Sequence, residues 1–190
     1  MAQAEPNEAF LRQVFQRVDT DRSGSISSNE LQAALSNGTW SPFSPETVRM
    51  MIGMFDRDGS STIDFEEFRD LWRYVSDWER CFRKYDLDGS GTIDKHELKT
   101  ALSSFGFRLS DQFYDLVIRK FDRTGRGTVA FDDFIQACIS IQTLTNAFRQ
   151  FDRYQIGQIT IGYEDFLTLV FELKGNLYLP QIAKRTNQKQ

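Results

Sequence analysis

Acidic and hydroxyl side chains alternate in several short segments of the chain, a pattern suited to binding a hard cation. The segment at residues 86–97 has the fullest set. Oxygen donors stand at its positions 1, 3, 5, 7 and 12, which are Asp86, Asp88, Ser90, Thr92 (through its backbone carbonyl) and Glu97. Ca²⁺ binds roughly six to eight oxygens. The sequence therefore predicts a Ca²⁺ site here, with Gly91 providing the left-handed turn at position 6.

The segment at residues 19–30 has donors at the same positions. They are Asp19, Asp21, Ser23, Ser25 and Glu30. Position 9 is Ser27 here and Asp94 in the segment at residues 86–97, so this segment has one carboxylate fewer. Both segments match the twelve-residue EF-hand loop. We expect residues 19–30 to bind Ca²⁺ more weakly than residues 86–97.

A third segment, at residues 56–67, has suitable donors but an unfavourable turn. The donors are Asp56, Asp58, Ser60, Thr62 and Glu67. Position 6 is Ser61 rather than glycine, and the left-handed backbone costs a non-glycine residue about 1–2 kcal/mol. That cost corresponds to about a tenfold loss of affinity. We predict a weak site that fills at high Ca²⁺ concentration and that could also bind Mg²⁺.

Two further copies of the loop, at residues 122–133 and 152–163, have lost most of their donors. In residues 122–133, the donor positions carry Thr124, Arg126 and Ala130, and Asp133 is too short to close the cage as glutamate does. We expect Arg126 to place a positive charge where the ion would lie. In residues 152–163 the donor positions are largely replaced, ending at Tyr163. Neither copy is predicted to bind Ca²⁺.

The spacing of the five loops predicts the helices that position them. Successive loops begin 37, 30, 36 and 30 residues apart. Residues 65–85 and 131–151 contain no glycine or proline, and their apolar residues recur at helical spacing, so each predicts one helix of about 20 residues shared by two loops. The longer steps contain helix breakers at residues 37–42 and 103–106. The predicted fold is all-α: five EF-hand helix-loop-helix units, eight helices, and short β-ladders between paired loops.

The predicted domain comprises residues 8–172, between a short flexible N-terminus (residues 1–7) and a basic C-terminal extension (residues 173–190). EF-hand units pack in pairs, and the fifth has no partner within the chain. Alone, it would expose an apolar face. The residues concerned are Phe148, Phe151, Phe166, Leu169 and Phe171. We expect a two-fold dimer through the fifth unit, in which each copy covers the other; the alternative is that the C-terminal segment folds back over this face.

Five loops joined by two shared helices resemble the penta-EF-hand family. Specific stretches carry the resemblance: residues 14–19 (VFQRVD), 34–40 (ALSNGTW), 108–113 (RLSDQF), 118–123 (IRKFDR) and 130–136 (AFDDFIQ). The resemblance covers about residues 8–172. It implies a Ca²⁺-dependent adaptor that binds Pro- and Tyr-rich segments of partner proteins, among them an ESCRT-associated scaffold, the outer COPII coat and annexins. Departures from the family are a short N-terminal arm, better ligands in residues 56–67, fewer acidic ligands in residues 152–163 and the C-terminal extension.

The resemblance also implies a pocket for partners. Its aromatic positions are matched by Trp72, Trp78, Phe105, Phe131 and Tyr163, and Arg108 matches a residue that shifts when Ca²⁺ binds. Tyr74 joins Trp72 and Trp78 on the predicted shared helix, and flat aromatic faces are suited to stacking against proline rings. The alternative is that these aromatic side chains belong to the core.

Composition narrows the classes of function. The 190 residues carry a net charge of −4, which argues against nucleic acid as the main partner. We find no paired nucleophile and base and no phosphate-binding loop in the sequence, so these motifs give no indication of an enzyme. The alternatives to an adaptor are a calcium buffer and the regulatory subunit of a calpain-like protease, which would form a heterodimer instead of a homodimer. No leader or membrane span is predicted, so we expect a soluble protein of the cytoplasm, with possible nuclear presence. We also expect Ca²⁺-dependent recruitment to endoplasmic reticulum, vesicle or endosomal membranes, with only indirect membrane contact.

Overall fold

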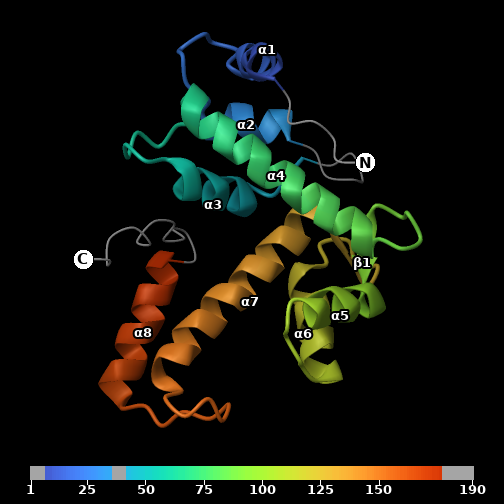
Figure 1. The fold of residues 1–190 in the computed structure, drawn as a ribbon, viewed down its shortest axis with the longest axis vertical. Coiled ribbons are helices and arrows are strands. Elements are labelled where there is room, and N and C mark those ends of the chain that lie inside the picture. Colours follow the sequence, from blue (N-terminus) through green and yellow to red (C-terminus); the bar gives the residue numbers. More distant parts are fainter. Residues whose placement is uncertain (1–6, 36–41, 177–190) are drawn as a thin grey trace.

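The computed structural model describes residues 7–35 and 42–176, which form eight helices and a two-stranded sheet (Figure 1). The elements of the first two EF-hand units are α1 (Glu8–Val18), α2 (Ser28–Ala34), α3 (Pro45–Phe55) and α4 (Phe65–Tyr85). Those that follow are β1 (Thr92–Asp94), α5 (Lys95–Ser104), α6 (Asp111–Phe121), β2 (Thr128–Ala130), α7 (Phe131–Phe151) and α8 (Tyr163–Asn176). The predicted eight helices are confirmed within the described part of the chain.

Several sequence expectations concern residues outside that part. Residues 1–6 of the expected flexible N-terminus, residues 37–41 of the first breaker and residues 177–190 of the basic extension all lie outside the described residues. The helix α8 runs to Asn176. None of the helices within residues 7–35 and 42–176 combines the length and apolar character needed to cross a lipid bilayer.

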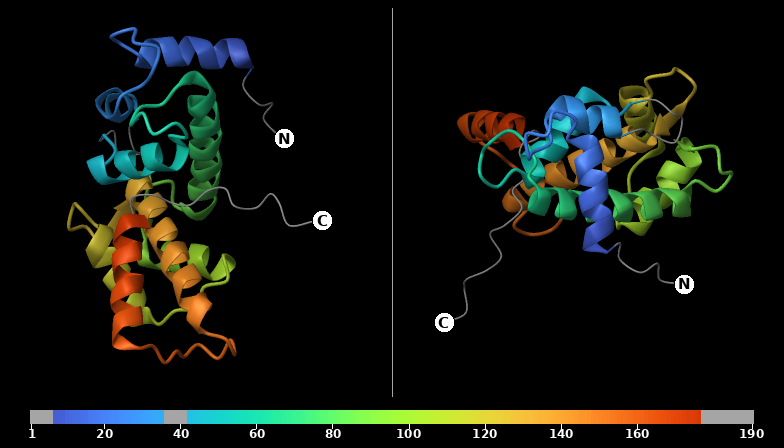
Figure 2. Two further views of the ribbon diagram at one scale, coloured as in Figure 1. Left: turned by 90° about the vertical axis from the view of Figure 1, so that its left-hand side faces the viewer. Right: turned by 90° about the horizontal axis from the view of Figure 1, so that it is seen from above.

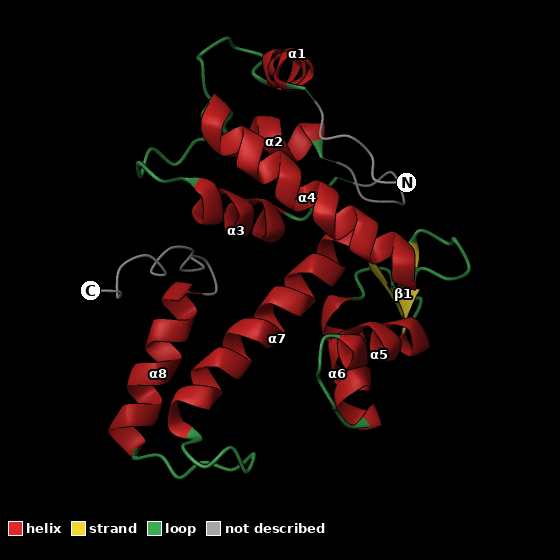
Figure 3. Ribbon diagram, in the orientation of Figure 1, coloured by secondary structure: helices red, strands yellow, loops and turns green. Residues whose placement is uncertain are grey.

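The two predicted shared helices are present as α4 and α7, each 21 residues long. Figure 3 shows both as unbroken helices that meet near the middle of the molecule. Aromatic rings hold the crossing: the ring centroids of Trp78 and Phe134 are 6.0 Å apart, and those of Phe82 and Phe134 are 5.6 Å apart. Because each helix leaves one loop and enters the next, it rigidly links successive EF-hand units.

Loop pairs are joined by short β-interactions at position 8, as predicted. Ile26 and Ile63 exchange backbone hydrogen bonds of 2.8 and 2.9 Å, pairing the first two loops. The antiparallel strands β1 and β2 pair the third and fourth loops, with Ile93 opposite Val129. These four side chains are fully buried. Burial of a branched apolar side chain on each loop explains why loops that have lost cation donors still keep this position apolar.

One hydrophobic core runs through both pairs of units. Where they meet, Phe43 before α3 packs edge-to-face on Phe131 at the start of α7, with ring centroids 5.7 Å apart. The fifth unit projects away from this core, and α8 lies beside α7 in Figure 1 and in the left view of Figure 2. Its large apolar residues remain exposed within the single chain, notably Tyr154, Ile156, Tyr163, Phe166 and Phe171.

Candidate cation sites and the adjoining groove

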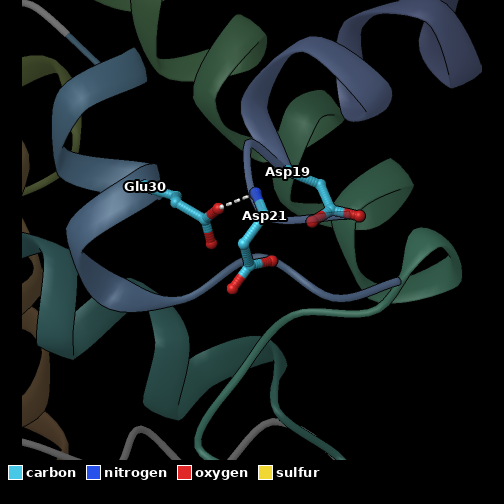
Figure 4. Close-up of side chains that lie close together, drawn as sticks. All are labelled: Asp19, Asp21 and Glu30. Atoms are coloured by element: carbon cyan, nitrogen blue, oxygen red, sulfur yellow. Dashed lines mark hydrogen bonds between the residues drawn. The ribbon is translucent and has the colours of Figure 1, made fainter. Parts of the chain in front are cut away.

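Three carboxylate clusters are present among the described residues, one in each of the first three loops. They are Asp19, Asp21 and Glu30; Asp56, Asp58 and Glu67; and Asp86, Asp88 and Glu97. In each cluster one oxygen from every residue lies within 4.8 Å of the others. Figure 4 shows the first cluster, with Asp19 at the end of α1, Asp21 in the loop and Glu30 reaching back from α2. The sequence pattern therefore folds into three convergent oxygen-donor sites.

The loop backbone creates this convergence. Positions 4 and 6 have positive φ in all five loops: Arg22 and Gly24, Gly59 and Ser61, Gly89 and Gly91, Gly125 and Gly127, Gln155 and Gly157. Two left-handed residues separated by one residue turn the chain tightly around its first aspartate. In the third loop, the carboxylate of Asp86 accepts hydrogen bonds from the backbone N–H groups of Ser90 (2.9 Å) and Gly91 (3.0 Å). The first aspartate thus organises the turn and also faces the site.

The glutamate at position 12 connects the two ends of each of these loops. The Oε1 atom of Glu97 accepts the N–H of Leu87 (2.7 Å), and its Oε2 accepts the N–H of Asp94 (2.9 Å). Asp94 in turn accepts the N–H of Glu97, forming a capping box that starts α5. Ser27 with Glu30 and Asp64 with Glu67 form the same box at α2 and α4. Position 9 therefore serves as a helix N-cap in this structure.

Hydrogen bonds lower the pKa of one carboxylate in each of the three clusters. Donors on Ser27 and Thr20 lower the pKa of Glu30 to about 2. Hydrogen bonds from Ser60 lower the pKa of Asp58, and those from Ser90 lower that of Asp88. A negatively charged set of oxygen atoms is what a hard divalent cation requires.

The donor sets fit Ca²⁺. Oxygens coordinating one Ca²⁺ lie about 2.3–2.6 Å from the ion, and hence within roughly 5 Å of each other. The 4.8 Å limit of the three clusters satisfies this condition. Each set contains only oxygen donors, which excludes a preference for softer metals. The first three loops carry acidic residues positioned to bind Ca²⁺.

The second loop reaches the same geometry at the expense of backbone strain. Ser61 has a φ of 63°, in the left-handed region predicted for it. Its N–H still donates to Asp56 over 2.9 Å, as the corresponding glycines do in the neighbouring loops. The weaker affinity predicted for this loop rests on that strained residue.

An arginine side chain contacts the closing carboxylate of the fourth loop, but this arginine is Arg123 and not Arg126. Arg123 at position 2 contacts Asp133 through Nε and Asp132 through Nη2, each at 2.6 Å. Arg126 is exposed at the loop surface. Asp133 is one methylene shorter than glutamate, so it does not reach the position 2 backbone N–H and meets the arginine side chain instead. The sequence signal available for this contact was an arginine at position 2 of a loop that ends in two adjacent aspartates.

A groove of about 1350 Å³ lies between the shared helices and the fifth unit. Tyr74, Trp78 and Cys81 of α4 line one side. Cys138 and polar residues such as Asn146 line the side formed by α7. Phe105 and Phe107 after α5 and Glu172 and Leu173 of α8 complete it. Three of the predicted partner-binding residues, Tyr74, Trp78 and Phe105, are therefore brought together.

The other predicted partner-binding residues lie elsewhere. Trp72 faces the opposite side of α4, where its ring lies 6.0 Å from that of Phe10 in α1. Phe131 is buried between Phe43 and Phe82, so it belongs to the core. Arg108 is exposed before α6, and Tyr163 is exposed at the start of α8. The polar residues of α7 in the groove were not predicted, because glutamine and asparagine on an amphipathic helix give no signal that separates a groove from bulk solvent.

Comparison with known proteins agrees with this architecture. The family model described as EF-hand domain pair matches residues 8–73 and 75–139. The chain is 54% identical to sorcin of Schistosoma japonicum over 161 residues, covering 85% of this chain and 94% of that protein. It is 44% identical to human peflin over 82% of this chain, and spans about half of peflin's length (55%).

A solved structure supports the same assignment. It is described as a homolog of programmed cell death 6 protein from Leishmania major Friedlin, and it superposes with a TM-score of 0.75 at 38% identity. The match covers 86% of this chain and 93% of that one. Human sorcin is also 38% identical, over 79% of this chain and 77% of its own length. With five EF-hand units, two shared helices and these relatives, the chain belongs to the penta-EF-hand family of calcium-binding proteins.

Proposed function

We propose that the chain is a calcium-sensing adaptor that binds Pro- and Tyr-rich segments of partner proteins in the groove beside α4. The observation that carries this proposal is the direct connection of the groove to two cation loops. Tyr74 and Trp78 lie on α4, which runs from the second loop to the third. Phe105 is the C-cap of α5, the helix that leaves the third loop. Three aromatic rings on helices that adjoin cation loops are suited to a regulated, proline-binding surface.

The coupling follows from the position of Glu97. It lies on the first turn of α5, where its two carboxylate oxygens are held by the N–H groups of Leu87 and Asp94. Bound Ca²⁺ would supply a positive charge that competes with these N–H groups for the carboxylate. A displacement of Glu97 turns α5, and Phe105 at the other end of this ten-residue helix moves relative to Trp78. The groove would change shape in response to the third loop.

Pairing of the fifth unit belongs to the same proposal. Tyr154 and Tyr163 are 85% and 77% exposed in the single chain, and the fifth loop has no β-partner within the described residues. A second copy, or another penta-EF-hand chain, would cover these side chains and complete the loop pair. Such a dimer presents two grooves, so one dimer could bridge two partners.

Calorimetry tests the proposal. A Pro-Pro-Tyr-Pro peptide is titrated into the full chain with Ca²⁺ and with chelator, and binding is expected only with Ca²⁺. The double variant Glu30→Gln, Glu97→Gln should lose this binding while circular dichroism stays unchanged. The matched control Glu46→Gln, Glu66→Gln alters two exposed glutamates outside the clusters and should bind normally. Binding by the ligand variant equal to that of the control would refute calcium control.

Absence of peptide binding under both conditions, with Ca²⁺ uptake intact, would instead indicate a buffer or a protease-type regulatory subunit. Under the adaptor proposal, the partners belong to membrane traffic, membrane repair or cell death, and the chain moves from the cytoplasm to membranes when Ca²⁺ rises. Fractionation of cells before and after a Ca²⁺ ionophore tests this movement. An unchanged distribution would contradict it.

A further inference from the structure

The groove is bordered by the last helix of the described structure. Glu172 and Leu173 of α8 line it, and α8 ends at Asn176, three residues beyond Leu173. The chain then continues through residues 177–190. An extended segment advances about 3.3 Å per residue, so residues 177–182 could cover roughly 20 Å from the rim of the groove. Residues 174–176 therefore form the short linker between the rim of the groove and this segment.

The composition of this segment matches the chemistry of the groove. Residues 177–182 read Leu-Tyr-Leu-Pro-Gln-Ile, with one residue between Tyr178 and Pro180. Proline fixes its own φ and favours an extended residue before it, which lowers the entropy lost on binding. The aromatic faces of Tyr74, Trp78 and Phe105 are available for a proline ring, and the amide side chains of α7 for backbone groups.

Charge gives a second, independent match. Among the described residues that line the groove, the charged ones are Glu172 and Asp77, both acidic, and Asp77 is paired with Arg80. Residues 183–190, which follow the apolar segment, contain Lys184, Arg185 and Lys189 and no acidic residue. A tail with its apolar part in the groove would bring these cations near an acidic rim, where opposite charges attract.

We propose that residues 177–182 bind in this groove as an intramolecular ligand and compete there with partner segments. Occupation by the tail does not depend on the proposed function; only the competition rests on it. A ligand tethered by a short linker experiences an effective concentration in the mM range. A tail whose intrinsic Kd lies below this concentration therefore occupies the groove, and a partner must displace it, which lowers the partner's apparent affinity.

The chain's own cysteines report whether the groove is covered. The chain has two, Cys81 and Cys138, and both line the groove. Cys81 is half-buried and Cys138 is buried. The experiment measures the rate at which iodoacetamide labels Cys81 in the full chain, resolved from Cys138 by peptide mass. The variant Tyr178→Ser, Pro180→Ser should label at least fivefold faster than wild type, while the control Thr186→Ser, Asn187→Ser should label at the wild-type rate.

Equal labelling rates in all three proteins would overturn the proposal. Protection that increases with protein concentration would also overturn it, because the tail would then come from another copy. A Pro-Pro-Tyr-Pro titration of the variant Tyr178→Ser, Pro180→Ser, in which the tail cannot block the groove, separates this outcome from failure of the proposed function. Faster labelling with no peptide binding leaves the tail contact intact and rejects the adaptor; normal peptide binding with unchanged labelling keeps the adaptor and rejects the tail.

Discussion

The carboxylate of Asp132 accepts a hydrogen bond of 2.7 Å from the backbone N–H of Ser44, 88 residues earlier in the chain. Ser44 is the N-cap of α3, and Asp132 lies on the first turn of α7. Asp132 is completely buried and also contacts Arg123 of the fourth loop. A loop without the usual cation donors therefore anchors the first pair of EF-hand units to the second.

Removing this anchor should destabilise the whole chain. Asp132→Ala removes a completely buried acceptor and leaves the buried Ser44 N–H without it, while Arg123, whose side chain is 43% exposed, keeps Asp133. We expect the free energy of unfolding to fall by about 3 kcal/mol. Urea unfolding followed by circular dichroism measures it. The control Glu46→Ala removes an exposed pair with Arg49 and should change stability by less than about 0.5 kcal/mol; similar losses in both variants would contradict the anchoring role.

Asp133 should make stability depend on pH. Burial and the neighbouring charge of Asp132 raise the pKa of Asp133 to about 6, although Arg123 opposes the shift and Glu46 adds to it. In the unfolded chain the group titrates near pH 4 (roughly 3.9). Between these values the folded chain keeps a proton that the unfolded chain has released, so this group makes the free energy of unfolding fall as pH rises.

The substitution Asp133→Asn removes this titration and retains an oxygen acceptor for Arg123. Its free energy of unfolding relative to wild type should rise between about pH 4 and pH 6 and remain level above. Urea unfolding of both proteins at closely spaced pH values checks the window. A difference that stays constant from pH 4 to pH 7 would show that Asp133 titrates normally in the folded chain.

Relief of strain at Ser61 should strengthen the second cation loop. Ser61→Gly places the preferred residue at a φ of 63°, and we expect about a tenfold higher Ca²⁺ affinity for this loop. The reverse change in the third loop, Gly91→Ser, should lower its affinity by a similar factor. Calorimetric Ca²⁺ titration of both variants provides the comparison. Unchanged affinity in each would mean that the turn conformation contributes equally to the free and bound loops.

The exposed fifth unit should form the dimer contact. Phe166 on α8 and Leu116 on α6 are similarly exposed, at 49% and 51%, but only Phe166 belongs to the fifth unit. We expect wild type and Leu116→Asp to sediment at twice the chain mass of 22.1 kDa, and Phe166→Asp at the single-chain mass. Sedimentation equilibrium measures this directly. A wild-type chain that sediments at 22.1 kDa at all concentrations would reject self-pairing.

Local patterns were sufficient to predict the helices and the cation loops. The absence of glycine and proline from residues 65–85 indicated α4, and alternating donors indicated the clusters that include Glu30 and Glu97, because both features act over one or two turns of chain. The groove depends instead on which helix faces meet. Trp72 and Trp78 are six residues apart on α4 and point to different neighbours, Phe10 and Phe134, which the sequence of the helix alone does not specify.

Long-range polar contacts also could not be predicted from local sequence patterns. Arg126 was expected to place its charge at the ion position because it occupies a donor position, whereas in the structure Arg123 contacts the closing carboxylate of Asp133. Asp132, which Arg123 contacts, also accepts the N–H of Ser44 from a distant part of the chain. Such a contact has no periodic signature, since it joins two segments only after the core has brought them together.

The equal lengths of α4 and α7 also have a consequence for how the chain tolerates insertions. Each residue added to an α-helix rotates everything beyond it by roughly 100° and advances it by about 1.5 Å. The two 21-residue helices therefore set the same rotational phase between the second and third loops as between the fourth and fifth. One residue inserted in α4 would rotate the second pair of EF-hand units against the first without separating the paired loops within either pair. An insertion of about one full turn would restore the rotational phase and shift the second pair along the helix axis by roughly 5.4 Å.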